Sequence, residues 1–206
     1  MAMANEGAAV ALAARTADEI ESAADQVRTN GGAALAVQTD VTQQNQVDAL
    51  FAQVTEHLGQ VDILVNNAAI GSRMVGNLWE TEPDDWLEMF DVNVIGMVRC
   101  TRAVLPSMIE RRGGKIIVVG SIAGRSESWA LRNHELLGYA LSKAAANRFS
   151  EVLAAQVKGY GINVNCIGVG AHTTISEPGL RERARRTGQP PPPAIEQIPE
   201  DRRIRP

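Results

Sequence analysis

The sequence is poor in cysteine and carries no large surplus of charge, and each shortage excludes a class of protein. Its 206 residues include two cysteines, Cys100 and Cys166, and they form no Cys-x-x-Cys motif of the kind that binds metals or exchanges disulfides. We therefore expect two reduced thiols, a cytoplasmic location and no metal site. The formal net charge of −4 argues against a nucleic-acid-binding protein that neutralises phosphates.

Long hydrophobic runs are also missing. No apolar stretch approaches the roughly 18 residues of a membrane-spanning helix, so no membrane partner is expected. The apolar residues 1–14 resemble a signal peptide, but they lack a basic start and include Glu6. With 45% hydrophobic and 21% charged residues, the composition is typical of a globular protein, and the length fits one domain.

Short apolar segments alternate with amphipathic ones. Strands are expected at Ala8–Ala14, Ala33–Gln38, Val61–Val65, Lys115–Val119 and Ile162–Ile167. Helices are expected to begin at Thr16, Thr42, Thr81 and Tyr139. This alternation predicts an α/β fold, a doubly wound parallel sheet of the Rossmann-like kind, over residues 1–175.

Residues 176–206 differ from the rest, because they are rich in proline and arginine and lack apolar periodicity. We expect a mobile tail. A basic arm that binds nucleic acid is the less favoured alternative, since acidic residues are interspersed among the arginines.

Three side chains point to proton chemistry. Tyr139 and Lys143 lie four residues apart, so they share one face of a helix, and an ammonium beside a phenol lowers the pKa of the phenol. Such a tyrosine can exchange a proton with an alcohol oxygen. Ser121 follows an apolar strand, where a hydroxyl can polarise a carbonyl. Each feature alone has an ordinary explanation: the Tyr/Lys pair could arise by chance, and the serine could belong to a surface turn. Together, however, the features favour an active site.

Asparagine residues provide a second indication of a functional site. The small residues of Asn66-Asn67-Ala68-Ala69 follow another strand and would let a ligand approach the backbone. Asn93 lies inside the predicted long helix among apolar neighbours, where asparagine is a poor helix former. It predicts a local distortion of that helix that holds a water molecule.

These motifs, in this order, resemble those of the short-chain dehydrogenase/reductase family over residues 1–174. The resemblance implies an oxidoreductase that transfers a hydride between NADP(H) or NAD(H) and a carbonyl or secondary-alcohol substrate. Tyr139 would be the catalytic acid/base, and Lys143 would lower its pKa and bind the nicotinamide ribose. Ser121 would orient the substrate carbonyl. Asn93 would hold the water that links Lys143 to solvent.

The resemblance also implies a set of cofactor-binding residues. Asp40 would contact the adenine with Val41 beside it, and Gly170 and Thr174 match the glycine and threonine that follow the last strand. The ribose would be lined by Asn67, Ala68 and Ala69. Arg15 stands at the end of the first strand of this sequence, where an arginine favours the 2′-phosphate and an acid would repel it. We therefore predict NADP as the preferred cofactor.

The sequence departs from the family pattern in several places. The family's first strand and its turn, Thr-Gly-x-x-x-Gly-x-Gly, are absent, so Ala2–Gly7 is expected to be the end of the helix that follows that turn. The strands at 8–14 and 61–65 would then lose a common neighbour. His172 replaces an aliphatic residue. The loop 121–138, with His134, is long and either shapes substrate specificity or is a plain insertion.

Three interpretations remain open at this point. The favoured one is a working enzyme, a homodimer or homotetramer that associates through the helices carrying Asn93 and Tyr139. The alternative is a non-catalytic, truncated paralogue that acts only by association with other chains. An epimerase or dehydratase of the extended branch shares the Tyr/Lys pair, but the short length and the Asn66–Ala69 motif disfavour it.

Overall fold

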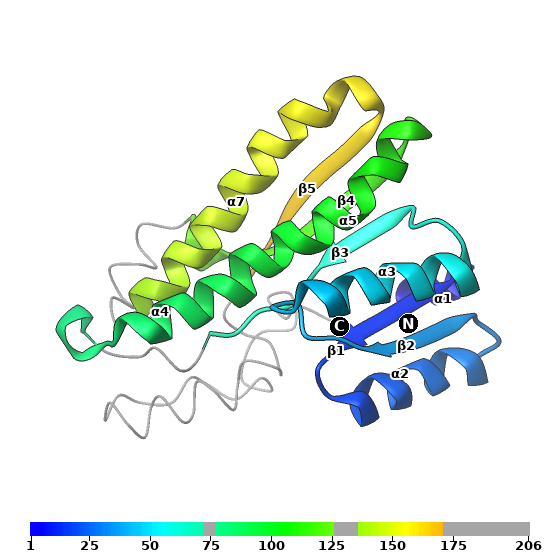
Figure 1. Cartoon of the computed structure of the whole chain (residues 1–206), viewed down its shortest axis with the longest axis horizontal. Coiled ribbons are helices and arrows are strands. Elements are labelled where there is room, and N and C mark those ends of the chain that lie inside the picture. The colour runs from blue at the N-terminus through cyan, green and yellow to red at the C-terminus, as the bar shows by residue number, and fades with distance from the viewer. Residues whose placement is uncertain (72–76, 126–135, 171–206) are drawn as a thin grey trace, which may run out of the picture.

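The structure is a computed structural model, and it describes residues 1–71, 77–125 and 136–170. In this part of the chain, strands and helices alternate (Figure 1). The strands are β1 (Val10–Ala14), β2 (Ala34–Gln38), β3 (Ile63–Asn66), β4 (Gly114–Ser121) and β5 (Ile162–Val169). The α-helices are α1 (Ala2–Asn5), α2 (Ala17–Thr29), α3 (Gln44–Leu58), α4 (Pro83–Phe90), α5 (Met97–Glu110) and α7 (Leu137–Val157). Shorter helical segments are η1 (Leu78–Glu80), η2 (Asp91–Gly96), η3 (Ile122–Gly124) and η5 (Lys158–Tyr160).

The strands form two parallel sheets rather than one. β1 pairs with β2, and β3, β4 and β5 pair in that order. In the larger sheet, Ile116 lies opposite Leu64 on one side and Val164 on the other. The predicted parallel α/β architecture is therefore confirmed, and among the described residues the first and third strands lack a common neighbour, as predicted.

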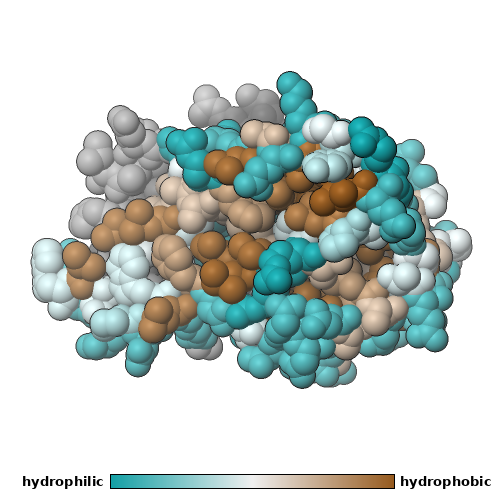
Figure 2. Space-filling model, turned by 45° about the horizontal axis from the view of Figure 1, so that its top comes forward, coloured by the Kyte–Doolittle hydropathy of each residue, from teal (hydrophilic) through white to brown (hydrophobic). Residues whose placement is uncertain are grey.

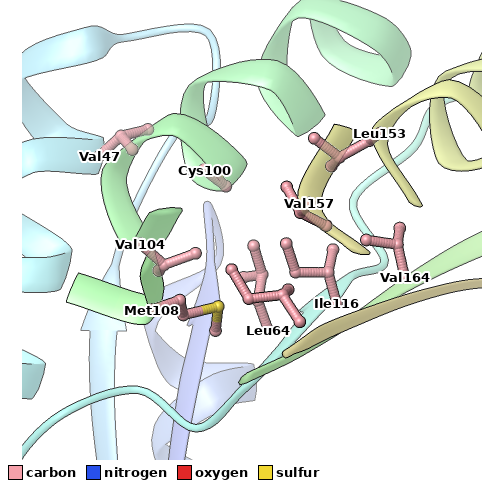
Figure 3. Packing of buried hydrophobic residues seen from close by; sticks show 10 residues of the cluster. Val47, Leu64, Cys100, Val104, Met108, Ile116, Leu153, Val157 and Val164 are labelled. Carbon is pink, nitrogen blue, oxygen red and sulfur yellow. The ribbon is translucent and has the colours of Figure 1, made fainter. Parts of the chain in front are cut away.

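The main core lies between the three-stranded sheet and helices α3, α5 and α7 (Figure 3). Met108 of α5 and Ile116 of β4 are fully buried there. The other buried members are Val47, Leu64, Cys100, Val104, Leu153, Val157, Ile162 and Val164. A smaller cluster of Val37, Leu50 and Val54 joins β2 to α3. The larger sheet thus carries most of the buried apolar surface that stabilises the fold.

The stretch Pro83–Glu110 is helical throughout, as α4, the π-helix η2 and α5. By length and composition it is the one described segment that could cross a membrane. It packs against α3, α7 and β3, however, and Met89, Val104 and Met108 are buried inside the protein. It is therefore the core helix of this α/β domain.

Two predicted helix caps are wrong by one residue, and α7 begins at Leu137, two residues before the predicted start at Tyr139. Helix α3 begins after Gln43, and the Thr42 hydroxyl donates instead to Asp40 Oδ1 at 2.8 Å. Helix α4 begins after Glu82, and Thr81 donates to the Leu78 carbonyl at 2.8 Å. Both threonines are used by the preceding turn, which competes with capping.

Candidate active site at the end of strand β4

A serine hydroxyl group lies at the end of strand β4. Ser121 is its last residue and lies opposite Val169 of β5, at the carboxyl end of the sheet. The turn η3 follows, and Ser121 Oγ accepts a hydrogen bond from Ala123 N at 3.2 Å. Because that bond uses a lone pair, Ser121 keeps its own proton for donation. With 8% of its surface exposed, the hydroxyl is fixed in place.

Tyr139 meets Ser121 from the first turn of α7. The two side chains share a hydrogen bond, which lowers the pKa of the Tyr139 phenol, but burial has the larger effect and raises that pKa. The ring also lies against the backbone of Gly71, where an added Cβ would come within 3.1 Å of ring carbons. The phenol is therefore held in one position and stays protonated at neutral pH.

Lys143 lies one turn further along α7. Its Nζ is 5.8 Å from the centre of the Tyr139 ring and donates to the Val119 carbonyl at 2.9 Å. Burial lowers the pKa of this ammonium, and the nearby Cys166 opposes that shift. Burial has the larger effect on the Tyr139 pKa here, and Nζ donates to a strand carbonyl, so the predicted lowering of that pKa by Lys143 stays a prediction.

Asn93 lies in η2, so the predicted distortion of the long helix is present as a π-helix. Its side chain is 4% exposed. Oδ1 accepts from Ile70 N at 2.7 Å, and Nδ2 donates to Ile70 O at 2.8 Å and to Ser142 Oγ at 3.0 Å. The amide therefore clamps the segment after β3 to α7. Its predicted role in holding water stays a prediction.

The predicted cofactor residues lie along one groove at the carboxyl ends of β1, β2 and β3. They are Arg15, Asp40, Val41, Asn67, Ala68 and Ala69. The groove continues between the two sheets and has a volume of about 710 Å³. These residues are spread over more than fifty positions of the sequence, and the parallel strands bring them to one edge.

Hydrogen bonds and nearby charges favour the ionised form of the Asp40 carboxyl group. Its Oδ1 accepts from Thr42 N at 2.9 Å and from Thr42 Oγ1 at 2.8 Å. The hydrogen bond from the Thr42 backbone lowers the pKa of Asp40 most, burial opposes it, and the charges of Arg15 and Arg99 lower it further. An acceptor of fixed orientation fits the exocyclic amine of a purine.

Several residues that support the site were not predicted. Ser142 is fully buried, accepts from Asn93 and donates to the Tyr139 carbonyl at 2.8 Å. Gly124 packs so tightly on α7 that an added Cβ would lie 2.6 Å from the Lys143 backbone. Ser142 stands directly before Lys143 in the sequence, but only the fold shows that Asn93 reaches it.

Other predicted residues are not brought together by the described structure. Gly170 is partly buried just beyond β5 and is not among the residues that line the groove. Thr174, His134, His172 and the segment 176–206 lie outside the described residues.

Comparisons with known proteins identify the family. The family model described as short chain dehydrogenase matches residues 1–184. The chain therefore belongs to the short-chain dehydrogenase family. A short chain dehydrogenase of Pseudocercospora fijiensis is 38% identical over 164 residues, which cover 78% of this chain and 50% of that protein. Oxidoreductase UcpA of Salmonella typhimurium is 37% identical over 73% of this chain and 55% of its own length. The chain thus spans about half the length of these relatives.

Solved structures agree with that assignment and confirm the Rossmann-like fold. The L-sorbose reductase of Gluconobacter frateurii, complexed with NADPH and L-sorbose, has a TM-score of 0.79 and 33% identity, covering 91% of this chain and 70% of that chain. A gluconate 5-dehydrogenase of Burkholderia cenocepacia, complexed with NADP and tartrate, has a TM-score of 0.77 and 31% identity, covering 87% and 68%. An NAD+-bound xylitol dehydrogenase has a TM-score of 0.81 and 28% identity, covering 89% and 69%.

Proposed function

We propose that this chain carries the acid/base centre of an oxidoreductase that moves a hydride between NADP(H) or NAD(H) and a carbonyl or secondary alcohol. The observation that carries the proposal is the hydrogen bond between Tyr139 and Ser121 at the end of β4, with Lys143 beside the ring. A partly buried phenol held by a fixed hydroxyl is a proton donor aimed at one point. The family assignment supports the same chemistry.

Each residue would have one task at the reacting oxygen. Ser121 donates a hydrogen bond to the substrate oxygen, which stabilises the negative charge that develops there. Tyr139 gives its proton to that oxygen during reduction and takes it back during oxidation. Lys143 supplies positive charge behind the phenol and so stabilises the phenolate that remains. Asn93 fixes the backbone that carries Gly71 against the tyrosine ring.

A nicotinamide cofactor, which supplies or accepts the hydride, fits the residues that line the groove. Asp40 and Val41 would hold the adenine, and the small side chains of Asn67, Ala68 and Ala69 would leave room for the ribose. Lys143 would reach the nicotinamide ribose. Arg15 lies near Asp40 and would bind a 2′-phosphate, so we propose that NADPH is preferred to NADH.

The preference for NADPH over NADH can be tested by substituting Arg15. Arg15→Ser should weaken NADPH binding about tenfold and leave NADH binding nearly unchanged, because one charge-assisted contact contributes about 1.5 kcal/mol or more. Fluorescence titration with both cofactors measures this. A wild-type protein that binds NADH more tightly than NADPH would contradict the proposal.

Substitution of each of the two tyrosines of the sequence tests the acid/base role of Tyr139. Tyr139→Phe should lower NADPH-dependent reduction of a panel of ketones and keto-sugars about a thousandfold. Tyr160→Phe is the matched control, since Tyr160 is 41% exposed and lies in η5 away from the site. Equal turnover in wild type and Tyr139→Phe would refute the proposal.

An association surface supports an oligomer as a further part of the proposal. Leu87 of α4 and the α7 residues Leu141 and Val152 are 68%, 45% and 49% exposed. Figure 2 shows several hydrophobic side chains open on the surface of one face. We propose a homodimer or homotetramer in the cytoplasm, formed through these helices. Light scattering should show that Leu87→Glu shifts the protein toward the monomer.

The second candidate function is a non-catalytic chain that acts only by association. The observation that favours it is the division of the sheet into two parts among the described residues. If the purified chain binds neither NADPH nor NADH at millimolar concentration and still forms oligomers, this candidate replaces the enzyme.

A further inference from the structure

Tyr139 lies near the start of a helix whose N-cap residue provides no side-chain hydrogen bond. Helix α7 begins at Leu137, and the residue before it, Leu136, has no polar group with which to cap the first turn. Uncapped helix ends leave backbone groups without partners, so the first turn needs another anchor. The phenol of Tyr139 nevertheless has to meet Ser121, which belongs to a different element. The anchor of this turn therefore decides where the phenol lies.

Ser142 joins this turn to a buried side chain of another helical segment. It is 0% exposed, and its hydroxyl donates to the Tyr139 carbonyl at 2.8 Å and accepts from Asn93 Nδ2 at 3.0 Å. Serine in a helix often donates to a carbonyl three or four residues earlier, so the first bond is ordinary. The second bond is the informative one, because it connects α7 to η2.

The same Asn93 amide also controls the other side of Tyr139. It accepts from Ile70 N at 2.7 Å and donates to Ile70 O at 2.8 Å. The next residue, Gly71, lies against the Tyr139 ring, where an added Cβ would be 3.1 Å from two ring carbons. Tyr139 is therefore held at its backbone through Ser142 and at its ring through Gly71, and both contacts lead back to one amide.

The hydrogen atoms of this circuit fit in one arrangement. A serine hydroxyl has one hydrogen to donate, and an asparagine amide has two. The Ser142 hydrogen goes to the Tyr139 carbonyl, which can only accept, so Ser142 accepts from Asn93. The other Nδ2 hydrogen of Asn93 goes to the Ile70 carbonyl. Removal of the Ser142 hydroxyl would thus leave a buried amide hydrogen without its partner and release the turn that carries Tyr139.

We propose that Ser142 is a positioning residue for the acid/base pair, because its hydroxyl fixes the turn of α7 that brings the Tyr139 phenol to Ser121. The inference rests on the function proposed above and adds a residue that acts through Tyr139. Proton transfer depends steeply on the placement of the donor, so loss of this hydroxyl should slow the chemical step and leave substrate binding nearly unchanged.

The NMR signal of the Tyr139 phenol tests the geometric part without substrate or cofactor. Tyr160→Phe leaves Tyr139 as the one tyrosine of the sequence, and an isotope label at its ring carbon Cζ reports the hydrogen bonding of the phenol. In this background, Ser121→Ala should move the signal, because it removes the partner of the phenol. Ser142→Ala should move the signal in the same direction, and it should add little once Ser121 is already alanine.

Ser150→Ala is the matched control. Ser150 is 3% exposed, and its hydroxyl donates to the Ala146 carbonyl at 2.9 Å, which is the same kind of bond on the same helix. It lies about two turns beyond Ser142, so its loss should leave the Tyr139 signal in place. If Ser142→Ala does not fold, Asn93→Ala breaks the circuit at its other end and should move the signal in the same direction.

Steady-state kinetics on the full chain provides a second arm. Ser142→Ala should lower kcat about tenfold and change KM by less than about twofold, whereas Ser150→Ala should change neither. The inference is overturned if folded Ser142→Ala keeps the wild-type signal, if Ser150→Ala moves the signal equally, if the shifts of Ser121→Ala and Ser142→Ala add in full, or if KM alone changes. A wild-type chain without turnover would instead refute the proposed function and leave the NMR result standing.

Discussion

The three-stranded and two-stranded halves of the sheet differ in completeness and in chemistry. β4 has a neighbour on each side and passes through the main core, whereas β1 has one neighbour within the part of the chain that the structure describes. The side chains placed for proton transfer, Ser121, Tyr139 and Lys143, all lie in the three-stranded half. Arg15, which would favour NADPH, and Asp40, which would contact the adenine, lie in the other half. The reaction centre therefore rests on the better packed half, and cofactor choice rests on the exposed one.

The largest expected effect is a difference in local stability. Amides of β4 should exchange only by global unfolding, while those of β1 should exchange by local opening, with rates at least a thousandfold faster. Native-state hydrogen exchange with residue-level resolution measures both. Similar exchange rates in the two strands would show that the halves unfold as one unit and would remove the distinction.

Core truncation should reveal the same asymmetry. Ile116→Ala removes a fully buried side chain of β4 and should lower the free energy of unfolding by about 2–5 kcal/mol. Val37→Ala in the small cluster of β2 removes less surface from a site that can relax, so about 1–2 kcal/mol is expected. Urea denaturation measures both, and a larger loss for Val37→Ala would reverse the comparison.

Substitution of Asn93, which clamps the segment after β3 to α7, should have an intermediate effect on the free energy of unfolding. Asn93→Ala leaves the backbone groups of Ile70 without partners, and we expect a loss of about 2 kcal/mol. Asn147→Ala is the control, because Asn147 is also buried but lies outside this clamp. A loss of catalytic turnover without any loss of stability would instead indicate that Asn93 acts on the reaction alone.

Much of this asymmetry could be predicted from the sequence, and some could not. The strand positions followed from short apolar segments, and the distorted helix followed from one misplaced asparagine. The rise in the Tyr139 pKa that burial causes could not be predicted, because burial is a tertiary property that residue spacing does not show. The partners of Asn93, at Ile70 and Ser142, depend on segments 23 and 49 residues away.

The smallest expected effect is on pH dependence. Burial lowers the folded-state pKa of Lys143 below its ordinary 10.5, so the folded state disfavours the charged form. This contribution to stability is present above pH 10.5 and is lost as pH falls through the lowered pKa. Relative to Lys143→Met, wild type should therefore lose stability as pH falls through that window. Parallel curves for the two proteins would contradict the assigned burial.

The central claim is that Ser121 and Tyr139 act together on one substrate oxygen, and a double-mutant cycle on turnover tests it most directly. Ser121→Ala alone should lower turnover about a hundredfold and Tyr139→Phe about a thousandfold. If the two side chains form one unit, the double variant should be no more than about twofold slower than Tyr139→Phe. A double variant slowed by the full product of the two single effects would show that they act independently and would contradict the account.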